Sequence, residues 1–548
     1  MLITTISQID AIRKDGGLTT AEEQLLENCR DGEPTFLGDG NLPDAPNDSV
    51  EIRADILRYL MLGGCADWPV HERGTELRGA WISGQLDLWF AKTRGRNGFF
   101  SCVFEHKIEA LQMEADVLNL GGSVFPGLNG QGAKITGGVS LRNANTTGEV
   151  AFASAEIGGQ LSCAGATLDG GRRDALNAQG AKITGDVILL NSMTTGEVSF
   201  SGAEIGGQLS FTGVSLDGKD GYALNVQRLV VKDSFFWCDI KRVAGRANFE
   251  AAHAADLVDD APSWDKVERL RLVGFTYDTL VGPYDLAMRK AWLAKGARLL
   301  GDFHPQPYQQ LAKFFRDSGH RFEAREILVE KEFRQKRETR HGRLRHAIRL
   351  RKQTGSDRAE ISARFFNDPH WFGDRISLYL TGYGYKPWRS LIALLVLFGL
   401  AAIGAKLVWE QGDFAPNSDI LLTSPSWQYY ANATGSNGKD LFQNPARCWA
   451  RGPDQTMADR NGLPSGTNPP PAPDHPGRDY ETFSSLYYGI DLVVPIINLG
   501  QTDAWAPSTT RGPAGVWFFY LSKVLIALGW IITAIAAAAV TGIIRKDE

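Results

Sequence analysis

The most regular feature of the chain is a pattern of apolar positions that repeats between residues 128 and 225. The segment LNGQGAKITGGVSLRNANTTGEVAFASAEIGGQLSCAGATLDG begins at Leu128, a near-copy begins 48 residues later at Leu176, and a shorter third copy begins at Leu224. Within the copies a smaller unit, Ala-x-Ile-x-Gly-x-(Val/Leu), recurs at alternating steps of 22 and 26 residues. Alternating apolar residues bounded by glycine predict short β-strands.

A unit of this length is too short for a propeller blade and too rich in β-patterning for a helical repeat. It predicts a parallel β-solenoid over residues 76–245, with about 22 to 26 residues per coil. Apolar side chains would fill the interior, and Gly and Asn would form the corners. Because Asn129, Asn177 and Asn225 recur in every second coil, they would lie roughly 9.6 Å apart and form no direct ladder.

Helical segments are expected on both sides of the solenoid, because an open solenoid end is an exposed edge strand that invites polymerisation. Residues 1–75 are predicted to form an N-terminal helical cap, in which an amphipathic helix over Ser49–Gly64 covers the first coil. From residue 246 to 385 the apolar spacing of three and four favours helices. Pro307 would begin one of these helices and Gly319 would end it, giving a helical hairpin that packs rather than binds a ligand.

Two long apolar runs near the C-terminus, Leu391–Val408 and Val524–Ile544, each match the roughly 20 residues that a membrane span needs. They predict transmembrane helices within residues 386–410 and 516–548. Lys and Arg precede the first run and follow the second, so both termini are expected in the cytoplasm and the loop 410–515 outside. The predicted fold class is therefore multidomain α+β, with a solenoid, helical caps, a helical middle segment and two C-terminal spans.

The loop between the spans divides into two parts. Residues 411–481 are rich in Pro, Gly, Asn and Ser and predict irregular structure. Residues 482–503 hold an apolar run of the length typical of a re-entrant or interfacial segment. Span, short apolar helix, glycine-bearing turn and span is also the order of a pore-loop channel, although NLGQ lacks the run of carbonyls of a potassium filter. The candidate residues of this segment are Asp491, Pro495, Asn498, Gly500 and Gln501.

A strongly basic strip, Lys331–Lys352, precedes the first span and holds ten Lys or Arg residues. It predicts orientation of the spans and contact with an anionic lipid leaflet. The candidate lipid contacts are Arg340, Arg343, Arg345, Arg349, Arg351 and Lys352. The formal charge of −5 gives no reason to expect nucleic acid as a partner. Small residues four apart in the spans, such as Ala401 and Ala405, would permit close helix packing and a homo-oligomer.

No residues of the chain match a known catalytic or cofactor-binding pattern. The six cysteines are far apart and the nine histidines are scattered without an accompanying carboxylate cluster. GxGxxG after a strand, a Walker loop, CxxC, HExxH and GxSxG are all missing. The sequence therefore predicts no catalytic residues, no metal site and no cofactor.

Several motifs together resemble a group of bacterial membrane proteins, often labelled membrane-associated oxidoreductase or uncharacterised. The motifs are EIRADILRYLMLGG, VHERGTELRGAWISGQLDL, AEIGGQL, PQPYQQLAKFFRDSGHRFEAREIL, YGYKPWRSL and DLVVPIINLGQTDAW. The resemblance covers most of the chain from Glu51 onward. It implies a bacterial source, a location in the inner membrane and the same solenoid-plus-anchor layout, and it supplies no catalytic residues.

Three functions remain open from the sequence. The first is a non-enzymatic membrane protein whose cytoplasmic solenoid is an interaction, scaffold or sensing module that binds a protein partner. The second is a gated channel or membrane effector, with the candidate residues of 482–503 lining a conduit. The third is the oxidoreductase that the resemblance implies, which would need a cofactor site of unusual form.

Overall fold

The computed structural model describes residues 3–171, 173–299, 301–354, 373–417, 481–494 and 496–541. The side chains of residues 343–354, 416, 539 and 540 are not described. The chain divides into two compact units, residues 1–338 and residues 339–548. The first holds the β-solenoid, and the second holds the two apolar helices.

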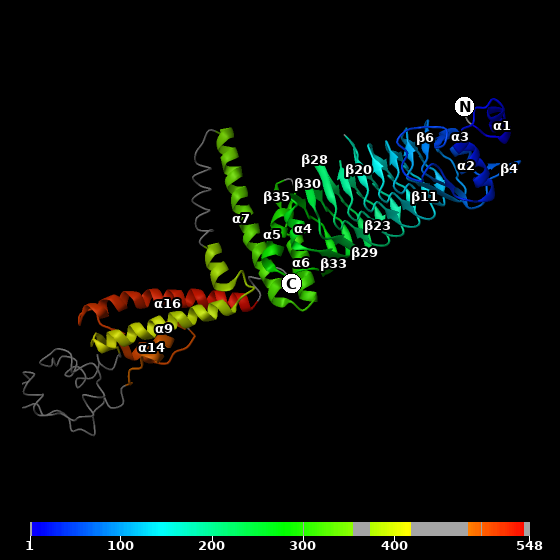
Figure 1. Ribbon diagram of the computed structural model, residues 1–548. Helices are drawn as coiled ribbons and strands as arrows, with labels where there is room; N and C mark the ends of the chain where they lie inside the picture. Colours follow the sequence, from blue (N-terminus) through cyan, green and yellow to red (C-terminus); the bar gives the residue numbers. More distant parts are fainter. Residues whose placement is uncertain are drawn as a thin grey trace, which may run out of the picture. The chain divides into compact units, whose positions relative to one another are not determined.

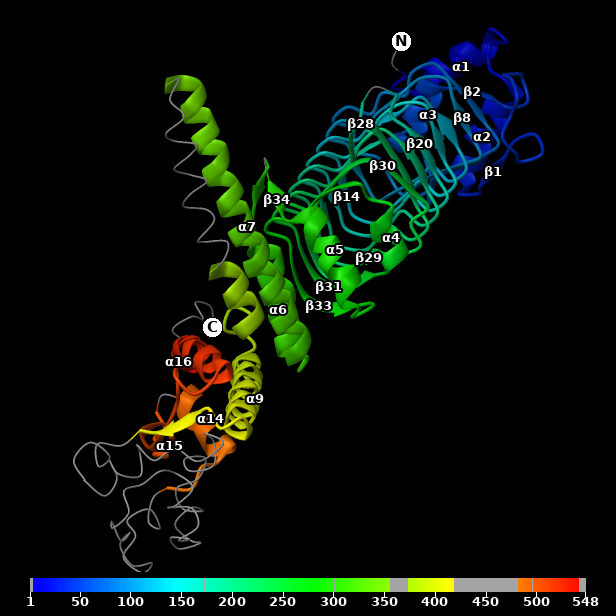
Figure 2. The ribbon, with the colours of Figure 1, turned by 90° about the vertical axis from the view of Figure 1, so that its left-hand side faces the viewer.

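The first unit is a parallel β-solenoid of about nine turns (Figures 1 and 2). Each regular coil contributes four strands of two or three residues, and each strand pairs in parallel with the equivalent strand of the next coil. One coil runs through β14 (Lys134–Ile135), β15 (Val139–Ser140), β16 (Asn145–Thr146) and β17 (Val150–Ala151), and the next begins at β18 (Glu156–Ile157). The predicted solenoid is therefore confirmed.

Stacking of the coils arranges the short strands in four columns. The first column holds β1 (Thr35–Phe36), β5 (Gly74–Arg78), β7 (Arg96–Phe100), β11 (Val117–Asn119), β15, β19 (Leu161–Ser162), β23 (Val187–Ile188) and β27 (Leu209–Ser210). The second holds β2 (Glu51–Arg53), β6 (Trp81–Ser83), β8 (Val103–Phe104), β12 (Val124–Phe125), β16, β20 (Thr167–Asp169) and β24 (Met193–Thr195). The third holds β9 (Ile108–Glu109), β13 (Leu128–Asn129), β17, β21 (Leu176–Asn177) and β25 (Val198–Ser199), and the fourth β10 (Glu114–Ala115), β14, β18, β22 (Lys182–Ile183) and β26 (Glu204–Ile205).

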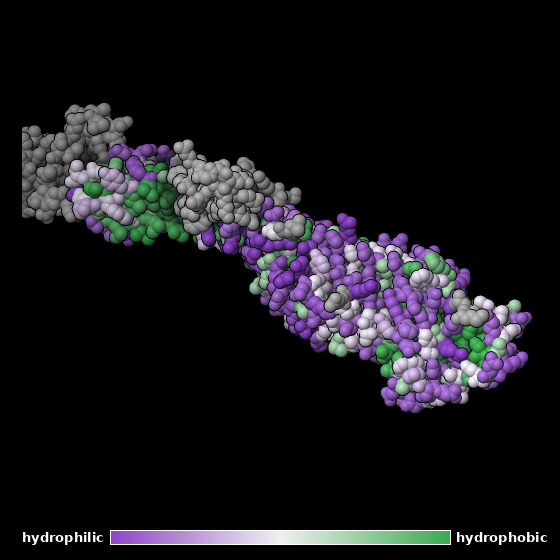
Figure 3. All heavy atoms as spheres, turned by 90° about the horizontal axis from the view of Figure 1, so that it is seen from above, coloured by the Kyte–Doolittle hydropathy of each residue, from purple (hydrophilic) through white to green (hydrophobic). Residues whose placement is uncertain are grey.

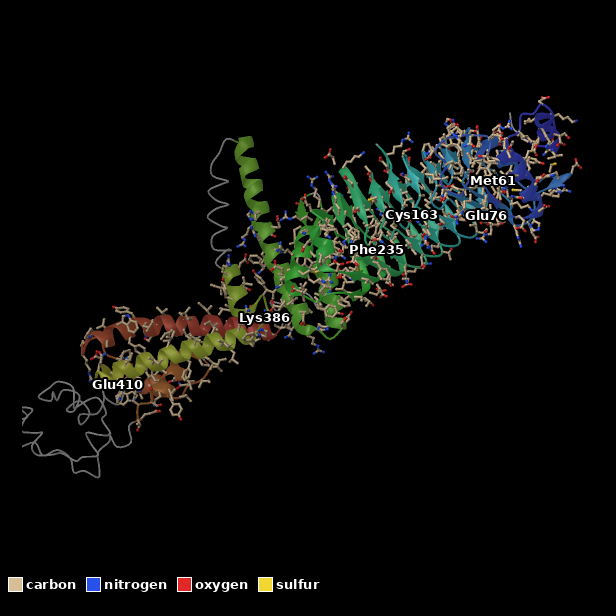
Figure 4. The ribbon with its side chains drawn as sticks, viewed as in Figure 1. Met61, Glu76, Cys163, Phe235, Lys386 and Glu410 are labelled. Carbon is tan, nitrogen blue, oxygen red and sulfur yellow. The ribbon has the colours of Figure 1, made fainter. Side chains whose placement is uncertain are left out.

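The interior and the corners follow the sequence pattern. Every coil sends apolar side chains inward, as in the fourth column, where Ile157 and Ile205 are at most 1% exposed. Each such side chain contributes roughly 2 kcal/mol of hydrophobic stabilisation. In Figure 4, Cys163 and Phe235 lie within the solenoid. Asn143 and Asn191 occupy one corner with φ near +55°, the left-handed conformation that Asn tolerates better than other side chains.

The strand register confirms the spacing expected for the recurring asparagines. Asn129 pairs with Ala151, which in turn pairs with Asn177, so an alanine separates the two asparagines. Asn129 and Asn177 each donate to a carboxylate instead, whereas Asn225 accepts from Asn248 of the next coil. The side-chain amide of Asn129 donates to Glu109 at 2.8 Å.

The solenoid does not end at residue 245, as the sequence pattern had indicated. Adjacent columns fuse into the long strands β28 (Ser215–Asn225) and β29 (Val230–Trp237), and further coils follow. These are β30 (Arg242–Asn248), β31 (His253–Asp259), β32 (Arg269–Arg271) and β33 (Thr276–Val281). Here aromatic side chains such as Trp237 and Phe249, with ring centroids 5.9 Å apart, fill the interior in place of Ile and Val. The Ala-x-Ile unit is lost at these coils, so the repeat disappears from the sequence while the coil persists.

The N-terminal cap consists of α1 (Ile6–Lys14), α2 (Thr20–Asp31) and α3 (Ala54–Met61), with the small hairpin β3 (Gly64–Cys65) and β4 (Trp68–Pro69). The amphipathic helix expected over Ser49–Gly64 is present but shorter, because Glu51–Arg53 forms strand β2 and pairs with β6. Ile56 and Leu60 of this helix are fully buried. The side chain of Glu22 is also fully buried, and it accepts hydrogen bonds from the backbone N–H and the guanidinium of Arg53. This pair fastens α2 to β2 at the open end of the solenoid.

The C-terminal cap is held by an ion pair whose two side chains are both fully buried. It contains α4 (Ala261–Asp265) and α5 (Leu286–Gly296), with the hairpin β34 (Arg298–Leu299) and β35 (Asp302–Phe303). The guanidinium of Arg289 donates two hydrogen bonds to Asp259, at 2.6 and 2.7 Å, and both side chains are fully buried. The indole N–H of Trp264 donates to the same carboxylate at 2.6 Å.

Two further helices follow the cap as the sequence predicts. Helix α6 (Gln306–Asp317) contains Pro307 in its first turn, and Gly319 with φ of +84° separates it from α7 (Arg321–Thr354). The buried face of α6 includes Tyr308 and Phe315 and belongs to the hydrophobic core of the solenoid. This helix therefore packs against the last coils, where it covers the end of the solenoid.

Candidate functional site

The second unit contains two apolar helices, α9 (Trp388–Glu410) and α16 (Pro513–Val540), both long enough to cross a membrane. Less than a third of the apolar stretch of each is buried. The helices therefore differ from the core helices of soluble domains, whose apolar side chains are covered. The large apolar side chains that they expose are Leu391, Ile392, Leu395, Val396, Leu400, Ile403, Leu407, Trp517, Tyr520, Val524, Leu528, Trp530 and Ile531.

The space-filling view makes the same contrast visible. In Figure 3 green hydrophobic spheres gather over the apolar helices, whereas the solenoid surface is mostly purple and white. In Figure 4 the labelled residues Lys386 and Glu410 mark the two ends of α9. The exposed apolar surface thus lies between two polar ends, as expected of a segment that crosses a bilayer.

A short helix, α14 (Ser485–Val493), packs against both apolar helices. Its backbone approaches them closely at two glycines. A Cβ added at Gly489 would lie 2.9 Å from the Ala402 backbone nitrogen, and one added at Gly529 of α16 would overlap the Val493 carbonyl oxygen. Ala401 and Ala405, which were expected to permit close helix packing, are both fully buried in the hydrophobic core of the second unit.

After α14 the chain turns back, and the carboxylate of Asp491 holds the returning segment. It accepts hydrogen bonds from the Leu499 N–H at 2.8 Å and from the N–H and hydroxyl of Thr502 at 2.8 and 2.9 Å. Asn498 accepts from the Gly500 N–H at 2.8 Å and donates to Asp503 at 3.2 Å. These polar side chains stabilise the turn through hydrogen bonds within the segment.

Gln501 ties the end of the returning segment to the start of α14. Its side-chain oxygen accepts from the Ser484 N–H at 2.9 Å, and its side-chain nitrogen donates to Glu481 at 2.8 Å. Gly500 has φ of +78°, which favours glycine. The structure thus brings together Asp491, Asn498, Gly500 and Gln501, four of the five candidates. Pro495, the fifth, lies outside the described residues.

An aromatic cluster closes the same end of the unit. The rings of Trp409 and Phe483 stack at 4.2 Å with an interplanar angle of 10°, and Trp505 meets Trp409 edge-on at 5.0 Å. Beside them β36 (Phe414–Pro416) pairs with β37 (Trp505–Pro507), which follows α15 (Gln501–Ala504). The cluster anchors residues 481–507 against the end of α9.

Two charged residues of this end were not singled out from the sequence. The carboxylate of Asp413, 3% exposed, accepts from the Gly515 N–H at 3.0 Å. The guanidinium of Arg511 donates to the Phe414 carbonyl oxygen at 2.5 Å, and burial lowers the pKa of Arg511. Their partners lie about a hundred residues away along the chain, so no local pattern marks them.

A cavity of about 250 Å³ opens between α14, β37 and α16. Its walls carry two groups of opposite charge, Asp491 from α14 and Lys523 from α16. The other residues that line it are Asn417, Tyr488, Leu492, Thr502, Trp505, Ala506, Pro507, Phe519, Ser522, Ile526 and Trp530.

The basic strip before the first span lies on α7. Arg340 is only 18% exposed and lies 3.4 Å from the carboxylate of Asp374, so an acidic side chain already faces this guanidinium. The other candidate lipid contacts, Arg343, Arg345, Arg349, Arg351 and Lys352, are on the same helix. Their side chains lie outside the described part of the structure.

The solenoid surface carries an ordered feature that sequence reasoning missed. Along the fourth column, outward Lys and Glu side chains alternate from coil to coil in strict register. Lys92 and Glu114, for example, form an ion pair at 3.2 Å. We call this column the charge ladder; its members are Lys92, Glu114, Lys134, Glu156, Lys182 and Glu204. The alternation of AKI and AEI within the repeat is the sequence signal from which the charge ladder could have been predicted.

A second polar group of the solenoid surrounds Asp174. Burial, together with the neighbouring carboxylates Glu197 and Glu149, raises its pKa to about 6. Glu149 itself accepts from Asn177 at 3.3 Å and lies 3.7 Å from Arg173. Among the described residues no group of three His, Cys, Asp or Glu side chains is placed to hold a metal ion.

The described cysteines behave as packing residues with one exception. Burial raises the pKa of Cys163 and of Cys102 to about 12, which leaves both thiols protonated and unreactive at neutral pH. At Cys65 a hydrogen bond from the Tyr59 hydroxyl, 3.2 Å away, lowers the thiol pKa. Cys448 lies outside the described residues.

Comparison with known proteins adds no relative. No family model, no curated protein and no solved structure matches the chain. The bacterial family that the sequence motifs resemble therefore remains a prediction, together with the activity that its label suggests.

Proposed function

We propose that this chain is a non-enzymatic integral membrane protein whose solenoid is a rigid module that binds a protein partner, as a scaffold or a sensor. The two apolar helices are its anchor, in the inner membrane of a bacterial cell with both termini in the cytoplasm. The exposed apolar surface of α9 and α16 supports the anchor, because such a surface is unstable in water. The regular outer face of the solenoid supports the binding module.

The observation that carries the proposal is the outward face of the first column. Its residues are uncharged and pair in register from coil to coil; four of the six are serine or asparagine, and one of these, Ser162, is buried. We call this column the small-residue face; its members are Asn119, Ser140, Ser162, Ile188, Ser210 and Phe236. A glycine corner separates it from the charge ladder, and a Cβ added at Gly158 would overlap the Thr136 carbonyl oxygen.

Such a face suits a flat partner for two physical reasons. Its serine and asparagine side chains are short and are held on regularly stacked strands, so few rotamers are ordered when a partner docks. The neighbouring charge ladder alternates in sign, so it produces no net field and instead presents a fixed pattern of donors and acceptors. Such a pattern determines the register in which a partner docks more than it changes the rate of association.

The test places a bulky charge on the small-residue face of the full-length chain. Ser140→Arg combined with Ser210→Arg should abolish co-purification of the partner from detergent-solubilised membranes, measured by quantitative mass spectrometry. Asn145→Arg, on an exposed position of the second column, is the matched control and should retain the partner. Unchanged circular dichroism and unfolding temperature would exclude unfolding. Retention of every co-purifying protein by the double variant would contradict the proposal.

A second candidate, a gated conduit, is favoured by one observation. The helix α14 packs against both apolar helices and the chain then returns beside it, as in a re-entrant loop. In an oligomer the exposed tip of this loop, with Ile496 at 81% exposure, would face neighbouring copies. A polar filter is disfavoured, because the side chains of Asp491 and Gln501 already accept hydrogen bonds from backbone N–H groups of their own segment.

Flux measurements decide between anchor and conduit. Chain reconstituted in liposomes loaded with an ion-sensitive dye should show no flux if the helices are an anchor alone. Asp491→Leu should change the flux only if the loop lines a conduit. Flux that appears in the wild-type chain and is altered by this variant would favour the second candidate.

A further inference from the structure

The cavity beside α16 has the polarity of an amphiphile. Along the helix its lining begins with Phe519, Ser522 and Lys523 and ends with Ile526 and Trp530. At 1.5 Å per residue these positions extend over roughly 16 Å. The charged and hydroxyl groups thus lie toward the Pro513 end of the helix, and the apolar side chains lie toward its middle.

The two charges of the cavity come from different walls and do not neutralise each other. Lys523 is exposed and its ammonium lies 5.3 Å from the ring centroid of Phe519; no carboxylate forms an ion pair with it in the described structure. Asp491 accepts three hydrogen bonds from its own loop. A carboxylate has about four lone-pair positions, so one acceptor position and most of the negative charge remain available.

We propose that this cavity binds a phosphate ester that also carries a primary ammonium group, supplied by an ethanolamine phospholipid of the membrane. Lys523 contacts the phosphate, Asp491 accepts from the ammonium, and an acyl chain follows Ile526 and Trp530. The proposal rests on the membrane insertion of α9 and α16 and on no property of the solenoid.

Size and chemistry both favour this class of ligand. A volume of about 250 Å³ corresponds to roughly eight water molecules at 30 Å³ each, comparable to the eight heavy atoms of phosphoethanolamine. A primary ammonium donates hydrogen bonds to a carboxylate, whereas the quaternary ammonium of a choline lipid has no N–H to donate. A glycerol headgroup supplies the phosphate without the cation, so it contacts Lys523 and leaves Asp491 without a cationic partner.

The experiment measures which lipid the full-length chain retains. Purified chain is placed in nanodiscs with equal amounts of ethanolamine, choline and glycerol phospholipids, extracted into mild detergent, and analysed by native mass spectrometry. We expect the ethanolamine lipid to be enriched about fivefold over the choline lipid, the effect of one partly exposed ion pair. Asp491→Asn removes the negative charge that faces the ammonium and should remove the enrichment. Lys523→Met should lower the retention of all three lipids, because they share the phosphate, and Lys523→Arg should keep it.

Lys406→Met is the matched control, because Lys406 is also exposed, lies on the other apolar helix and pairs with Glu410 at 3.9 Å. The Lys406→Met variant should leave both the retention of each lipid and the enrichment unchanged. A soluble arm with glycerophosphoethanolamine separates the sources: competition by this compound as effective as that of the lipid would overturn the membrane source. Equal retention of all three lipids, or enrichment that survives Asp491→Asn, would overturn the proposal itself.

The outcomes also separate this inference from the proposed function. A chain that stays in solution without detergent would contradict the membrane anchor before any lipid is compared. A chain that inserts in the bilayer yet retains no lipid selectively would contradict the cavity proposal alone.

Discussion

The two units of this chain place their apolar side chains on opposite sides. In the solenoid Ile157 and Phe200 point inward and are at most 1% exposed, whereas on α9 Leu395 and Ile403 are 58% and 61% exposed. The same residue types therefore pack against other protein side chains in the first unit and lie on the outer surface of the second. The difference sets a unit that buries its apolar side chains apart from a unit whose two helices could cross a membrane.

The two units also satisfy buried or partly buried carboxylates differently. In the solenoid Asp259 is neutralised by the guanidinium of Arg289, and both side chains are fully buried. In the second unit Asp491 has no cationic partner among the described residues and accepts from backbone N–H groups and one hydroxyl. The ion pair joins a helix to a coil, whereas the hydrogen bonds join a short loop to its own helix. The first should therefore govern global stability and the second local order.

The largest test of the comparison removes the second unit. A chain that ends at Glu338, the boundary between the units, should remain in the supernatant without detergent, whereas the full chain should sediment. The physical reason is the exposed apolar surface of α9 and α16, which this shorter chain lacks. Ultracentrifugation measures the outcome, with circular dichroism to establish that the β-structure persists. A fragment that still needs detergent would contradict the assignment of lipid contact to the second unit alone.

The next effect concerns the buried ion pair of the solenoid cap. Arg289→Met should lower the free energy of unfolding by about 3–5 kcal/mol, because it leaves the buried Asp259 without its counter-charge. Urea unfolding followed by tryptophan fluorescence measures the loss. Adding Asp259→Leu to this variant should restore part of the stability. A loss below about 1 kcal/mol would show that water reaches the carboxylate.

A smaller effect is expected where the carboxylate has backbone partners. Asp491→Leu should expose the amides of Leu499 and Thr502 to hydrogen exchange, with a local loss of about 2 kcal/mol from the charge-assisted hydrogen bonds. Asp491→Asn retains an acceptor and should show the milder change. The unfolding midpoint of the solenoid should not move in either variant. Unchanged exchange at both amides would contradict the role assigned to this side chain.

The solenoid also contains a pH-dependent term at Asp174. Its pKa of about 6 in the folded chain lies above the unfolded value of about 3.9, so the neutral form stabilises the fold below that unfolded value and this stability is lost as pH rises through 6. Asp174→Asn should therefore raise stability at pH 8 by about 1 kcal/mol, after allowance for solvent screening of this half-buried group, and change nothing at pH 3. Chemical unfolding at the two pH values measures the difference. An equal effect at both would contradict the assignment.

The smallest effect is expected at the charge ladder. Lys134→Glu places a third carboxylate in register between Glu114 and Glu156 and should cost about 0.5 kcal/mol at low salt. The cost should shrink in 0.5 M salt, because these exposed charges are screened. Lys134→Gln, which removes the charge without reversing it, should cost less. Insensitivity to salt would indicate that the alternation has no electrostatic role.

The sequence by itself determined the elements whose signal is local and repeated. The Ala-x-Ile units predicted the coils, and the apolar runs predicted α9 and α16. Asn was expected at the corners of the solenoid, and Asn143 and Asn191 lie at one of them. In each case the residues near in sequence experience the same environment, so composition and period are sufficient. The alternation of Lys134 and Glu156 was equally readable, because it lies within the same repeat.

Only the tertiary structure decided where the solenoid ends and which distant groups meet. Coils β30 to β33 replace the repeat with aromatic packing, so the period vanishes while the stacking persists. Arg289 reaches Asp259 across 30 residues, and Lys523 shares a cavity with Asp491 across a turn and a helix. Such meetings depend on how loops return the chain in space, and a pattern of neighbouring residues carries no record of that return.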